Sequence, residues 1–306
     1  MPAIEVRDLR KSYGVLVAVD GVSFEVAEGE VYALLGHNGA GKSSTVEILE
    51  GHRVASSGAV TVLGLDPSSA GRELRDRIGI VLQSSAVEKQ LTVREALRFY
   101  GSTYRNRRGI DDVIELIGLS EKSDARIRTL SGGQKRRLDL GLGIIGSPEV
   151  LFLDEPTTGF DPAARRQAWQ LIQQLCADGT TVLLTTHYLD EAEQLADRVG
   201  VMARGRLIAE GTPAELMATA PNATISFELP HDVVAQALRV PEGATISGHQ
   251  VSIETEHPTA VLAEITAAAV QLGVELEGLS VRRPSLEDVF LQLGEAAEAA
   301  ELEQVR

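Results

Sequence analysis

Short apolar runs alternate with helical patterns over the first 215 residues of the chain. Each run is continuously apolar, whereas a strand with one face in water alternates apolar and polar residues. The runs therefore predict strands buried on both faces of a mostly parallel sheet in an α/β domain. These runs are Val31–Leu35, Gly79–Leu82, Val150–Asp154 and Thr181–Thr186. At the start of the chain, Ile4–Leu9 and Val17–Val26 predict an antiparallel β flank.

Between Gln83 and Thr129 the strand pattern disappears and helical patterns dominate. We therefore predict a helical lobe inserted into the first domain at about residues 84–145. One of its helices opens at Thr92, which is followed three residues later by Glu95. This spacing is typical of a capping box, in which the two side chains satisfy backbone N–H groups at a helix start.

A change in composition near Pro221 marks the start of a second domain, so we expect the first domain at 1–220. The pattern beyond it predicts the order strand, helix, strand, strand, helix, strand, which is that of a ferredoxin-like α+β fold. The predicted elements are strands Thr224–Leu229, Thr245–Ser247, Val251–Thr255 and Val274–Val281, and helices Val233–Leu238 and Thr259–Leu272. A further helix is predicted at Ser285–Leu293. We expect an accessory domain at 221–293 and a disordered tail at 294–306.

The chain of 306 residues is acidic, with 44 Asp and Glu, 29 Lys and Arg, and a formal charge of −15. This balance argues against nucleic acid as a ligand, because such binders present a basic face. No apolar run approaches the roughly 18 residues that a membrane-spanning helix needs, and no signal peptide follows Met1. The single cysteine, Cys176, excludes an internal disulfide and suits a reducing cytoplasm. If the protein works at a membrane, another chain must supply the transmembrane part.

A glycine-rich segment between a predicted strand and a predicted helix fits the P-loop pattern G-x-x-x-x-G-K-S. Its glycines let successive backbone N–H groups point inward around an oxyanion, and the following helix start adds about half a positive charge. Lys42 supplies a full charge to the outer phosphates, and the Ser43 hydroxyl is placed to ligate Mg²⁺. We predict that ATP contacts Gly36, His37, Asn38, Gly39, Ala40, Gly41, Lys42, Ser43 and Ser44.

The predicted strand Val150–Asp154 ends in two acidic residues. Asp154 is positioned to hold Mg²⁺ through water, and Glu155 is placed to polarise the attacking water as general base. Together with the glycine-rich segment, these acids predict a P-loop NTPase. A GTPase is disfavoured, because the chain has no Asn-Lys-x-Asp motif for reading guanine.

The segment Leu130-Ser-Gly-Gly-Gln precedes a predicted helix at Gln134–Ile145. Ser131 is a favourable N-cap, and Gly132 and Gly133 expose N–H groups at the helix start, which predicts a second anion site. No second lysine loop exists for this site to complete. The segment resembles the signature motif of ABC ATPases. The resemblance implies two nucleotide domains paired head to tail, in which the signature contacts the ATP held by the partner's lysine loop. Its contact residues would be Ser131, Gly132, Gly133 and Gln134.

The resemblance covers Ile4 to about Met217 and implies roles for two more polar residues. Gln83 resembles the glutamine that senses Mg²⁺ and the attacking water, so it joins Ser43 and Asp154 in the expected metal site. His187, at the end of the predicted strand Thr181–Thr186, resembles the switch histidine that contacts the γ-phosphate. The implied catalytic residues are Glu155, His187 and Gln83.

Two further segments resemble family elements. Gly159-Phe-Asp-Pro resembles the D-loop, with Asp161 as an N-cap and Pro162 at the first helical position. Phe160 stands where the family usually has Leu, which puts the details of packing there in question. Tyr13 resembles the aromatic residue that stacks on adenine, and offset stacking adds about 1 kcal/mol beyond burial.

The segment Arg283–Phe290 is similar to the C-terminal region of daunorubicin-resistance-like export ATPases. The resemblance implies an ATPase that uses ATP and Mg²⁺ at the cytoplasmic face of the cell membrane. It would power a separate integral membrane permease that exports drugs or other small molecules. The working dimer would contain two copies of this chain or one copy and a paralogue.

Two alternatives remain open at this point. One is an importer ATPase whose C-terminal domain binds a regulatory ligand. The other is a soluble ABC ATPase that acts on DNA or ribosomes. The acidic charge, the short spacing between the lysine loop and the signature, and the single set of ATPase motifs argue against the second alternative.

Overall fold

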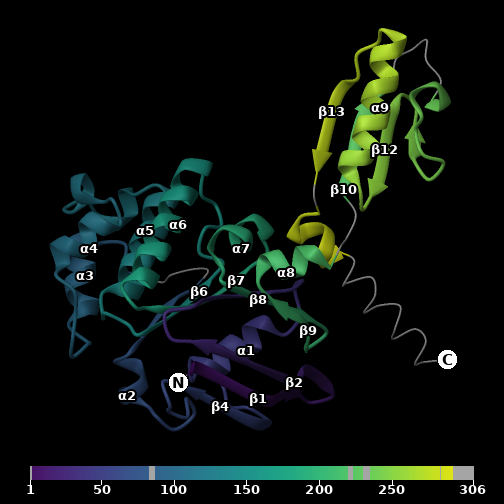
Figure 1. Cartoon of the computed structure of the whole chain (residues 1–306). Helices are drawn as coiled ribbons and strands as arrows, with labels where there is room; N and C mark the ends of the chain where they lie inside the picture. The colour runs from purple at the N-terminus through teal and green to yellow at the C-terminus, as the bar shows by residue number, and fades with distance from the viewer. Residues whose placement is uncertain (1, 83–86, 220–222, 230–234, 283, 292–306) are drawn as a thin grey trace. The chain divides into compact units, whose positions relative to one another are not determined.

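The computed structural model of the chain describes residues 2–82, 87–219, 223–229, 235–282 and 284–291. Contacts divide the chain into two compact units, one from Met1 to Pro213 and the other beginning at Ala214 (Figure 1). The predicted fold class is confirmed, because an α/β unit with an antiparallel flank and a helical lobe precedes a small α+β unit. The domain bounds of 1–220 and 221–293 stay predictions.

The main sheet of the first unit has the strand order β5-β6-β7-β3-β8-β9. Its strands are β3 (Val31–Leu35), β5 (Ile78–Val81), β6 (Val150–Asp154), β7 (Thr181–Thr186), β8 (Arg198–Ala203) and β9 (Arg206–Gly211). Neighbouring strands pair in parallel except at β9, which is an antiparallel edge. All residues of β3 and β7 are buried. The continuously apolar pattern of these runs therefore reflects burial on both faces of the sheet.

A second, antiparallel sheet has the order β2-β1-β4 and forms the predicted flank. Its strands are β1 (Pro2–Tyr13), β2 (Leu16–Ala27) and β4 (Ser57–Val62). Apolar side chains of this sheet join those of helix α1 (Lys42–Leu49) and of the main sheet in one buried cluster. Within it the rings of Phe24 and Tyr32 stack with centroids 5.1 Å apart. This cluster fixes α1 between the two sheets.

The predicted helical lobe contains helices that pack on one another at one end of the first unit (Figure 1). They are α3 (Val93–Gly101), α4 (Ile110–Leu116) and α5 (Gly132–Ile144), with short 3₁₀ turns at Ser120–Lys122 and Ile127–Thr129. The predicted capping box at the start of α3 is confirmed. The Glu95 N–H donates to Thr92 Oγ1 at 3.2 Å, and the Thr92 N–H donates to Glu95 Oε2 at 2.9 Å.

The remaining helices of the first unit flank the strands of the main sheet or join them. They are α2 (Arg72–Arg75), α6 (Pro162–Ala177) and α7 (Leu189–Leu195). A short helix, α8 (Pro213–Ala218), begins at the last residue of the unit. No helix in the described part of the chain is long and apolar enough to cross a membrane.

The second unit has one antiparallel sheet in the order β11-β12-β10-β13, covered by a helix. Its elements are β10 (Ala223–Glu228), a 3₁₀ turn at Ala235–Leu238, β11 (Thr245–Ser247), β12 (Gln250–Thr255), α9 (Pro258–Leu272) and β13 (Glu277–Arg282). This order is the one expected of a ferredoxin-like fold. The first two residues of the predicted helix Val233–Leu238 lie outside the described residues.

The last strand of the second unit begins later than predicted. We predict a strand from Val274, but Val274–Leu276 is not a strand and β13 begins at Glu277. Gly273 ends α9 with a φ of 70°, and the side chains of Val274 and Leu276 pack against the apolar cluster. Their apolar pattern therefore reflects burial below the helix end. A helix at 286–291 follows, begun by Ser285, whose N–H donates to Asp288 Oδ2 at 2.8 Å.

Candidate functional site

The loop between β3 and α1 carries the predicted phosphate site. Gly41 is the N-cap of α1 and has a φ of 103°, a conformation that L side chains rarely adopt. A Cβ atom at this position would lie 2.4 Å from the Ala18 carbonyl oxygen, so only glycine fits. No side chain of the described residues caps α1, and the first N–H groups of a helix lack partners within it. The loop therefore offers backbone donors to an anion.

Lys42 begins α1 and folds its amine back over the loop. Its Nζ donates to the carbonyl oxygens of Gly36 and His37, the second at 3.2 Å. Burial lowers the pKa of Lys42, while the nearby carboxylates of Glu155 and Asp154 act in the opposite direction. The ammonium group is thus half-buried, close to both acids, and held by acceptors that an anionic ligand would replace.

The two acids at the end of β6 differ in their surroundings. The Asp154 carboxylate accepts a hydrogen bond from the Thr185 hydroxyl of the neighbouring strand. Glu155 has a φ of 47°, and its N–H donates to the Thr185 carbonyl at 2.9 Å. Its Oε1 lies 2.9 Å from Nδ1 of His187, and its Oε2 accepts from the Thr158 hydroxyl at 3.2 Å. Two partners therefore orient the Glu155 carboxylate.

Parallel pairing brings the predicted groups to one edge of the main sheet. Strand β7 lies between β6 and β3, with Thr185 opposite Asp154 and Thr186 opposite Leu35. The carboxyl end of β6 leads into Glu155, that of β7 into His187, and that of β3 into the glycine-rich loop. The lysine, the two acids and the histidine of the prediction are thus brought together. Gln83 lies outside the described residues.

Tyr13 lies beside the phosphate loop at the end of β1. Its hydroxyl is 3.3 Å from Ser44 Oγ, and its side chain is partly exposed. The Lys11 Nζ and the Arg53 Cζ lie 5.1 and 5.5 Å from the centroid of the ring. The hairpin tip next to Tyr13 also exposes apolar side chains that our sequence reasoning passed over; these are Val15, Leu16 and Val17.

The signature segment forms the start of α5, two residues earlier than predicted. Ser131 is the N-cap, and its Oγ accepts from the Gln134 N–H at 3.2 Å while Gln134 Oε1 accepts from the Ser131 N–H at 2.9 Å. Gly132 and Gly133 are therefore the first helical residues. Phe160 is buried, and its ring would lie 3.9 Å from a Cβ at Gly133. The aromatic residue of the D-loop segment thus packs beside the signature.

The predicted cap at Asp161 is present. Asp161 Oδ1 accepts hydrogen bonds from the N–H groups of Ala163 and Ala164 at 2.9 and 2.8 Å, and Pro162 is the first residue of α6. Asp161 itself is exposed. The D-loop segment therefore stands at a rigid helix start.

Arg136, which the sequence analysis passed over, is 6% exposed and bonds to the backbone around Asp154 and Glu155. A signal was present in the sequence. Arg136 stands four residues before Leu140 and eight before Ile144, both buried on α5, so it lies on the buried face of that helix. A charged residue on such a face needs buried partners.

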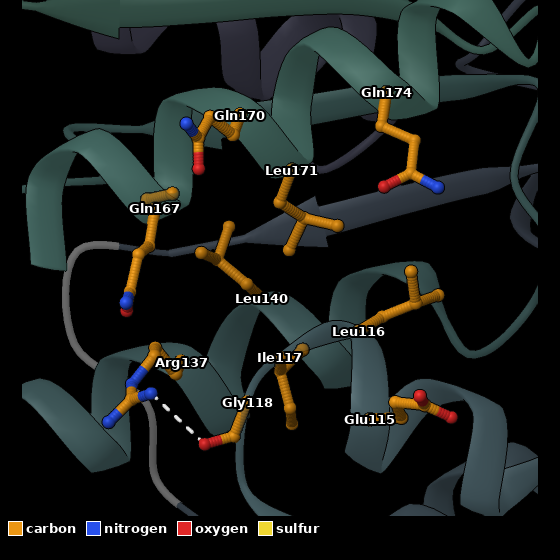
Figure 2. A pocket seen from close by; sticks show the side chains of 11 residues that line it. Glu115, Leu116, Ile117, Gly118, Arg137, Leu140, Gln167, Gln170, Leu171 and Gln174 are labelled. Carbon is orange, nitrogen blue, oxygen red and sulfur yellow. Dashed lines mark hydrogen bonds between the residues drawn. The ribbon is translucent and has the colours of Figure 1, made fainter.

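A pocket of about 350 Å³ lies between the helical lobe and α6 (Figure 2). The Arg137 Nη1 donates to the Gly118 carbonyl at 3.1 Å on one wall, and glutamine side chains of α6 line the other. The lining residues are Glu115, Leu116, Ile117, Gly118, Arg137, Leu140, Gln167, Ala168, Gln170, Leu171 and Gln174. None of the predicted site residues lines it, so the pocket is separate from the strand-end site.

Comparison with protein families matches both parts of the chain. Residues 19–158 match the family described as ABC transporter. Residues 223–285 match the family described as ABC transporter domain-containing protein-like, C-terminal domain. The two matched segments lie in the first and the second unit respectively.

Relatives cover almost the whole chain. The daunorubicin resistance ATP-binding protein DrrA2 of Streptomyces coeruleorubidus is 40% identical over 305 residues, covering 95% of this chain and 94% of that protein. The Nod factor export ATP-binding protein I of Rhizobium sp. (strain N33) is 39% identical, covering 95% and 96%. Among solved structures, cbiO1 from Clostridium perfringens, part of the ABC transporter complex cbiONQ, has a TM-score of 0.65 at 31% identity. It covers 71% of this chain and 91% of that one.

These similarities run through the glycine-rich loop, the signature helix and the acidic strand end. They also extend through the second unit, because the DrrA2 relative covers 95% of this chain, whereas the matched solved structure covers 71% of it. The chain belongs to the ABC transporter family, as an ATP-binding and ATP-hydrolysing subunit.

Proposed function

We propose that this chain binds ATP·Mg²⁺ at the loop 36–44 and hydrolyses it with Glu155 as general base, to power export through a separate membrane permease. The observation that carries the proposal is the meeting of Lys42, Glu155 and His187 at the carboxyl ends of neighbouring parallel strands. Glu155 Oε1 lies 2.9 Å from His187 Nδ1 there, and the Glu155 carboxylate interacts electrostatically with the Lys42 ammonium group.

The phosphate chain would lie over the N-terminus of α1. Backbone N–H groups of the loop Gly36–Ser44 and the Lys42 ammonium neutralise its charge, and Gly41 leaves the space that a close approach of the backbone requires. Tyr13 offers its partly exposed ring to adenine next to Ser44. The exposed apolar residues at the hairpin tip extend the same surface.

The residues at the strand end suit Mg²⁺, which prefers oxygen ligands and keeps several waters. The Ser43 hydroxyl and the Asp154 carboxylate supply such oxygens, and Gln83 would add a third. Among the described residues no cluster of three His, Cys, Asp or Glu could hold a metal by itself, so phosphate oxygens would complete the shell. When bound, Mg²⁺ neutralises charge that develops on the phosphate oxygens.

Hydrolysis requires a base and an orienting group. Water attacks the γ-phosphorus, the bond to the bridging oxygen breaks, and Glu155 accepts the proton of the water. His187 holds the Glu155 carboxylate through Nδ1, which leaves Nε2 to contact the γ-phosphate. Lys42 stabilises the charge on the leaving ADP.

A second nucleotide domain would close the site. The α5 N-terminus, with Ser131, Gly132, Gly133 and Gln134, has no lysine loop of its own and suits the ATP of a partner. Asp161 and the exposed start of α6 belong to the same surface. The partner would be a second copy of this chain or a paralogue, and ATP would shift the pair from open to closed.

The names of the relatives support export as the direction of transport. One relative is named for daunorubicin resistance and the other for Nod factor export, and each match covers 95% of this chain. The proposed place of action is the cytoplasmic face of the cell membrane, where the chain would be bound to an integral membrane permease. Drugs or other small molecules are the proposed cargo.

The test uses the complex itself. The chain is co-expressed with the permease encoded beside its gene, and detergent-purified material is assayed for ATPase activity. We expect co-purification, ATP hydrolysis by the wild type, and a loss of at least a hundredfold in kcat for Glu155→Gln, whose complex keeps ATP bound. The matched variant Glu121→Gln, on an exposed 3₁₀ turn, should hydrolyse ATP like the wild type.

Different failures of this test have different meanings. Hydrolysis by Glu155→Gln at the wild-type rate would remove Glu155 as the base. A chain that hydrolyses ATP but never co-purifies with the permease would overturn the transporter role and leave the ATPase chemistry intact.

A further inference from the structure

Arg136 is a buried cation one helical turn into α5. Its Nε donates to the Pro156 carbonyl at 3.0 Å, and its Nη2 donates to the carbonyls of Asp154 and Glu155 at 2.7 and 2.8 Å. Its Nη1 donates to the Leu82 carbonyl at the end of β5. One guanidinium thus joins α5 to two strand ends of the main sheet.

The guanidinium keeps its charge in this position. Burial lowers the pKa of Arg136, and the carboxylates of Asp139, Asp154, Glu191 and Glu155 act in the opposite direction. An arginine side chain is not deprotonated in proteins. The side chain therefore places five N–H donors and a positive charge directly behind the backbone of Glu155.

A second buried group holds the same segment from another side. Glu191 of α7 is fully buried, and its Oε1 accepts from the Thr157 hydroxyl at 2.8 Å and from Nε1 of Trp169 at 3.1 Å. Residues 154–157 are thus bonded to α5 through Arg136 and to α7 through Glu191. The helix α7 begins two residues after His187.

The conformation of Glu155 needs such support. A positive φ of 47° places a glutamate in the left-handed region, which is unfavourable for a residue with a side chain and persists only where the surroundings fix it. The Glu155 carbonyl accepts from Arg136, and its N–H donates to Thr185. These bonds lock both peptide groups beside the α-carbon and so set the direction of the carboxylate.

We propose that Arg136 is a positioning residue for ATP hydrolysis. It ties the signature helix α5 to the backbone of Glu155, so the orientation of the catalytic carboxylate depends on the position of α5. The inference rests on the proposed role of Glu155 as base. Because Ser131 and Gly132 begin the same helix, engagement of a partner's ATP at the signature reaches Glu155 through this side chain.

Lysine cannot replace this side chain. Its ammonium has three donors around a single nitrogen, whereas the planar guanidinium reaches carbonyls from three nitrogens in a fixed fork. Arg136→Lys therefore keeps the charge, but loses bonds to the segment 154–156. Arg136→Met removes the charge as well, and leaves several buried carbonyls without their donor.

The neighbouring residue provides a matched control. Arg137 follows on the same helix, is partly exposed, and donates from Nη1 to Gly118 at the wall of the pocket in Figure 2. Within the described ranges it makes no hydrogen bond to the segment 154–157. Arg137→Lys therefore makes the same chemical change at a site directed away from Glu155.

The experiment measures steady-state ATPase activity and the affinity for a fluorescent ATP analogue with the full-length chain. We expect Arg136→Lys to lower kcat by roughly tenfold to a hundredfold, because a displacement near 1 Å of a catalytic group has an effect of this size. KM and analogue affinity should change less than threefold. Arg137→Lys should keep kcat within threefold of the wild type.

A double variant separates positioning from general damage. If Arg136 acts through Glu155, the variant Glu155→Gln with Arg136→Lys should hydrolyse ATP no more slowly than Glu155→Gln alone. A further loss of tenfold in the double variant would show that Arg136 acts by another route and would overturn the inference. Thermal unfolding of each variant shows whether it folds. If Arg136→Met does not fold, Arg136→Lys is the variant that tests the inference.

Three other outcomes would also contradict the inference. They are wild-type kcat in Arg136→Lys, equal losses in Arg136→Lys and Arg137→Lys, and a loss of analogue affinity as large as the loss of kcat. Wild-type hydrolysis by Glu155→Gln would instead reject the proposed base, so the two failures remain distinguishable.

Discussion

Buried charged side chains surround the phosphate end of the main sheet. Glu50, Arg136 and Glu191 are at most 6% exposed. A buried charge is costly unless it is paired, hydrogen-bonded or neutralised. Arg136 meets this requirement with hydrogen bonds to the segment after β6. Glu191 meets it at Oε1 only, since its Oε2 is buried without a hydrogen-bond partner in the described part of the chain. Glu50 Oε2 lies 3.1 Å from Nδ1 of His52, and burial raises the Glu50 pKa, which favours the protonated form.

Glu50 makes stability depend on pH. Burial, followed by the nearby charges of Asp154 and Glu47, raises the pKa of Glu50 to about 8 from an ordinary 4.5. The folded state therefore holds this proton where the unfolded state has lost it. The stability that the proton confers is complete below about pH 4.5 and is lost as the pH rises towards 8.

We expect Glu50→Gln to remove this dependence. The difference in unfolding free energy between variant and wild type should shift in favour of the variant by about 1–3 kcal/mol between pH 5 and pH 8.5. Chemical denaturation at both pH values measures it. The control is Glu115→Gln on the exposed face of α4, which should show no such shift. If the unfolding free energies of wild type and Glu50→Gln changed by the same amount between the two pH values, the expectation would be contradicted.

At the scale of elements, the first residues of helices carry much of the site. Thr92, Ser131 and Asp161 are N-caps in the structure, as the sequence predicts. Ser131 and Asp161 cap α5 and α6, the two helices whose N-termini the proposed partner would contact. A capped start fixes the first turn, so the groups exposed there keep one position.

Two substitutions separate the capping role of Asp161 from the effect of its charge on stability. Asp161→Ala should lower the unfolding free energy by about 1 kcal/mol, because the N–H groups of Ala163 and Ala164 lose their acceptor. Asp161→Asn should lose less than half as much, since Asn caps equally well. Denaturant unfolding compares the two variants. Equal losses in both would assign the effect to the charge of Asp161 and not to the cap.

At the scale of the whole molecule, each unit has an apolar cluster of its own among the described residues. One joins the antiparallel flank, α1 and the main sheet, and the other joins α9 to β10 and β12. Each cluster belongs to a single unit. The two units should therefore lose their structure in separate steps, with the nucleotide site confined to the first.

A core variant of the second unit tests this separation. Phe227 is fully buried in the second cluster, and Phe227→Ala should cost about 3–5 kcal/mol in that unit. Calorimetry should show one transition shifted to lower temperature, and ATP affinity should stay within threefold of the wild type. The control Leu279→Ala changes a side chain that is 40% exposed. Loss of ATP binding in Phe227→Ala would contradict independent units.

Local patterns predicted most of the elements and, in the proposed site, the glycine-rich loop and the acidic strand end. The roles of Gln83, His187 and Tyr13 came from the family resemblance. The strands β3, β6 and β7 have the bounds expected from their apolar runs, because continuous burial leaves a continuous signal. The glycine-rich loop and the helix caps were likewise visible, since each depends on residues a few positions apart. The early strand predicted at Val274 was wrong, because an apolar run beneath a helix end looks like a strand.

Contacts between distant residues were decided only by the tertiary structure. The sequence could not show that Arg136 reaches Leu82, 54 positions away, or that Glu155 Oε1 meets His187. It also gave no sign that the pKa of Glu50 is raised, because that depends on burial, followed by the nearby charge of Asp154. Residue types determine which groups are present, whereas strand order and helix packing set their distances and dielectric surroundings, and these decide pKa and alignment.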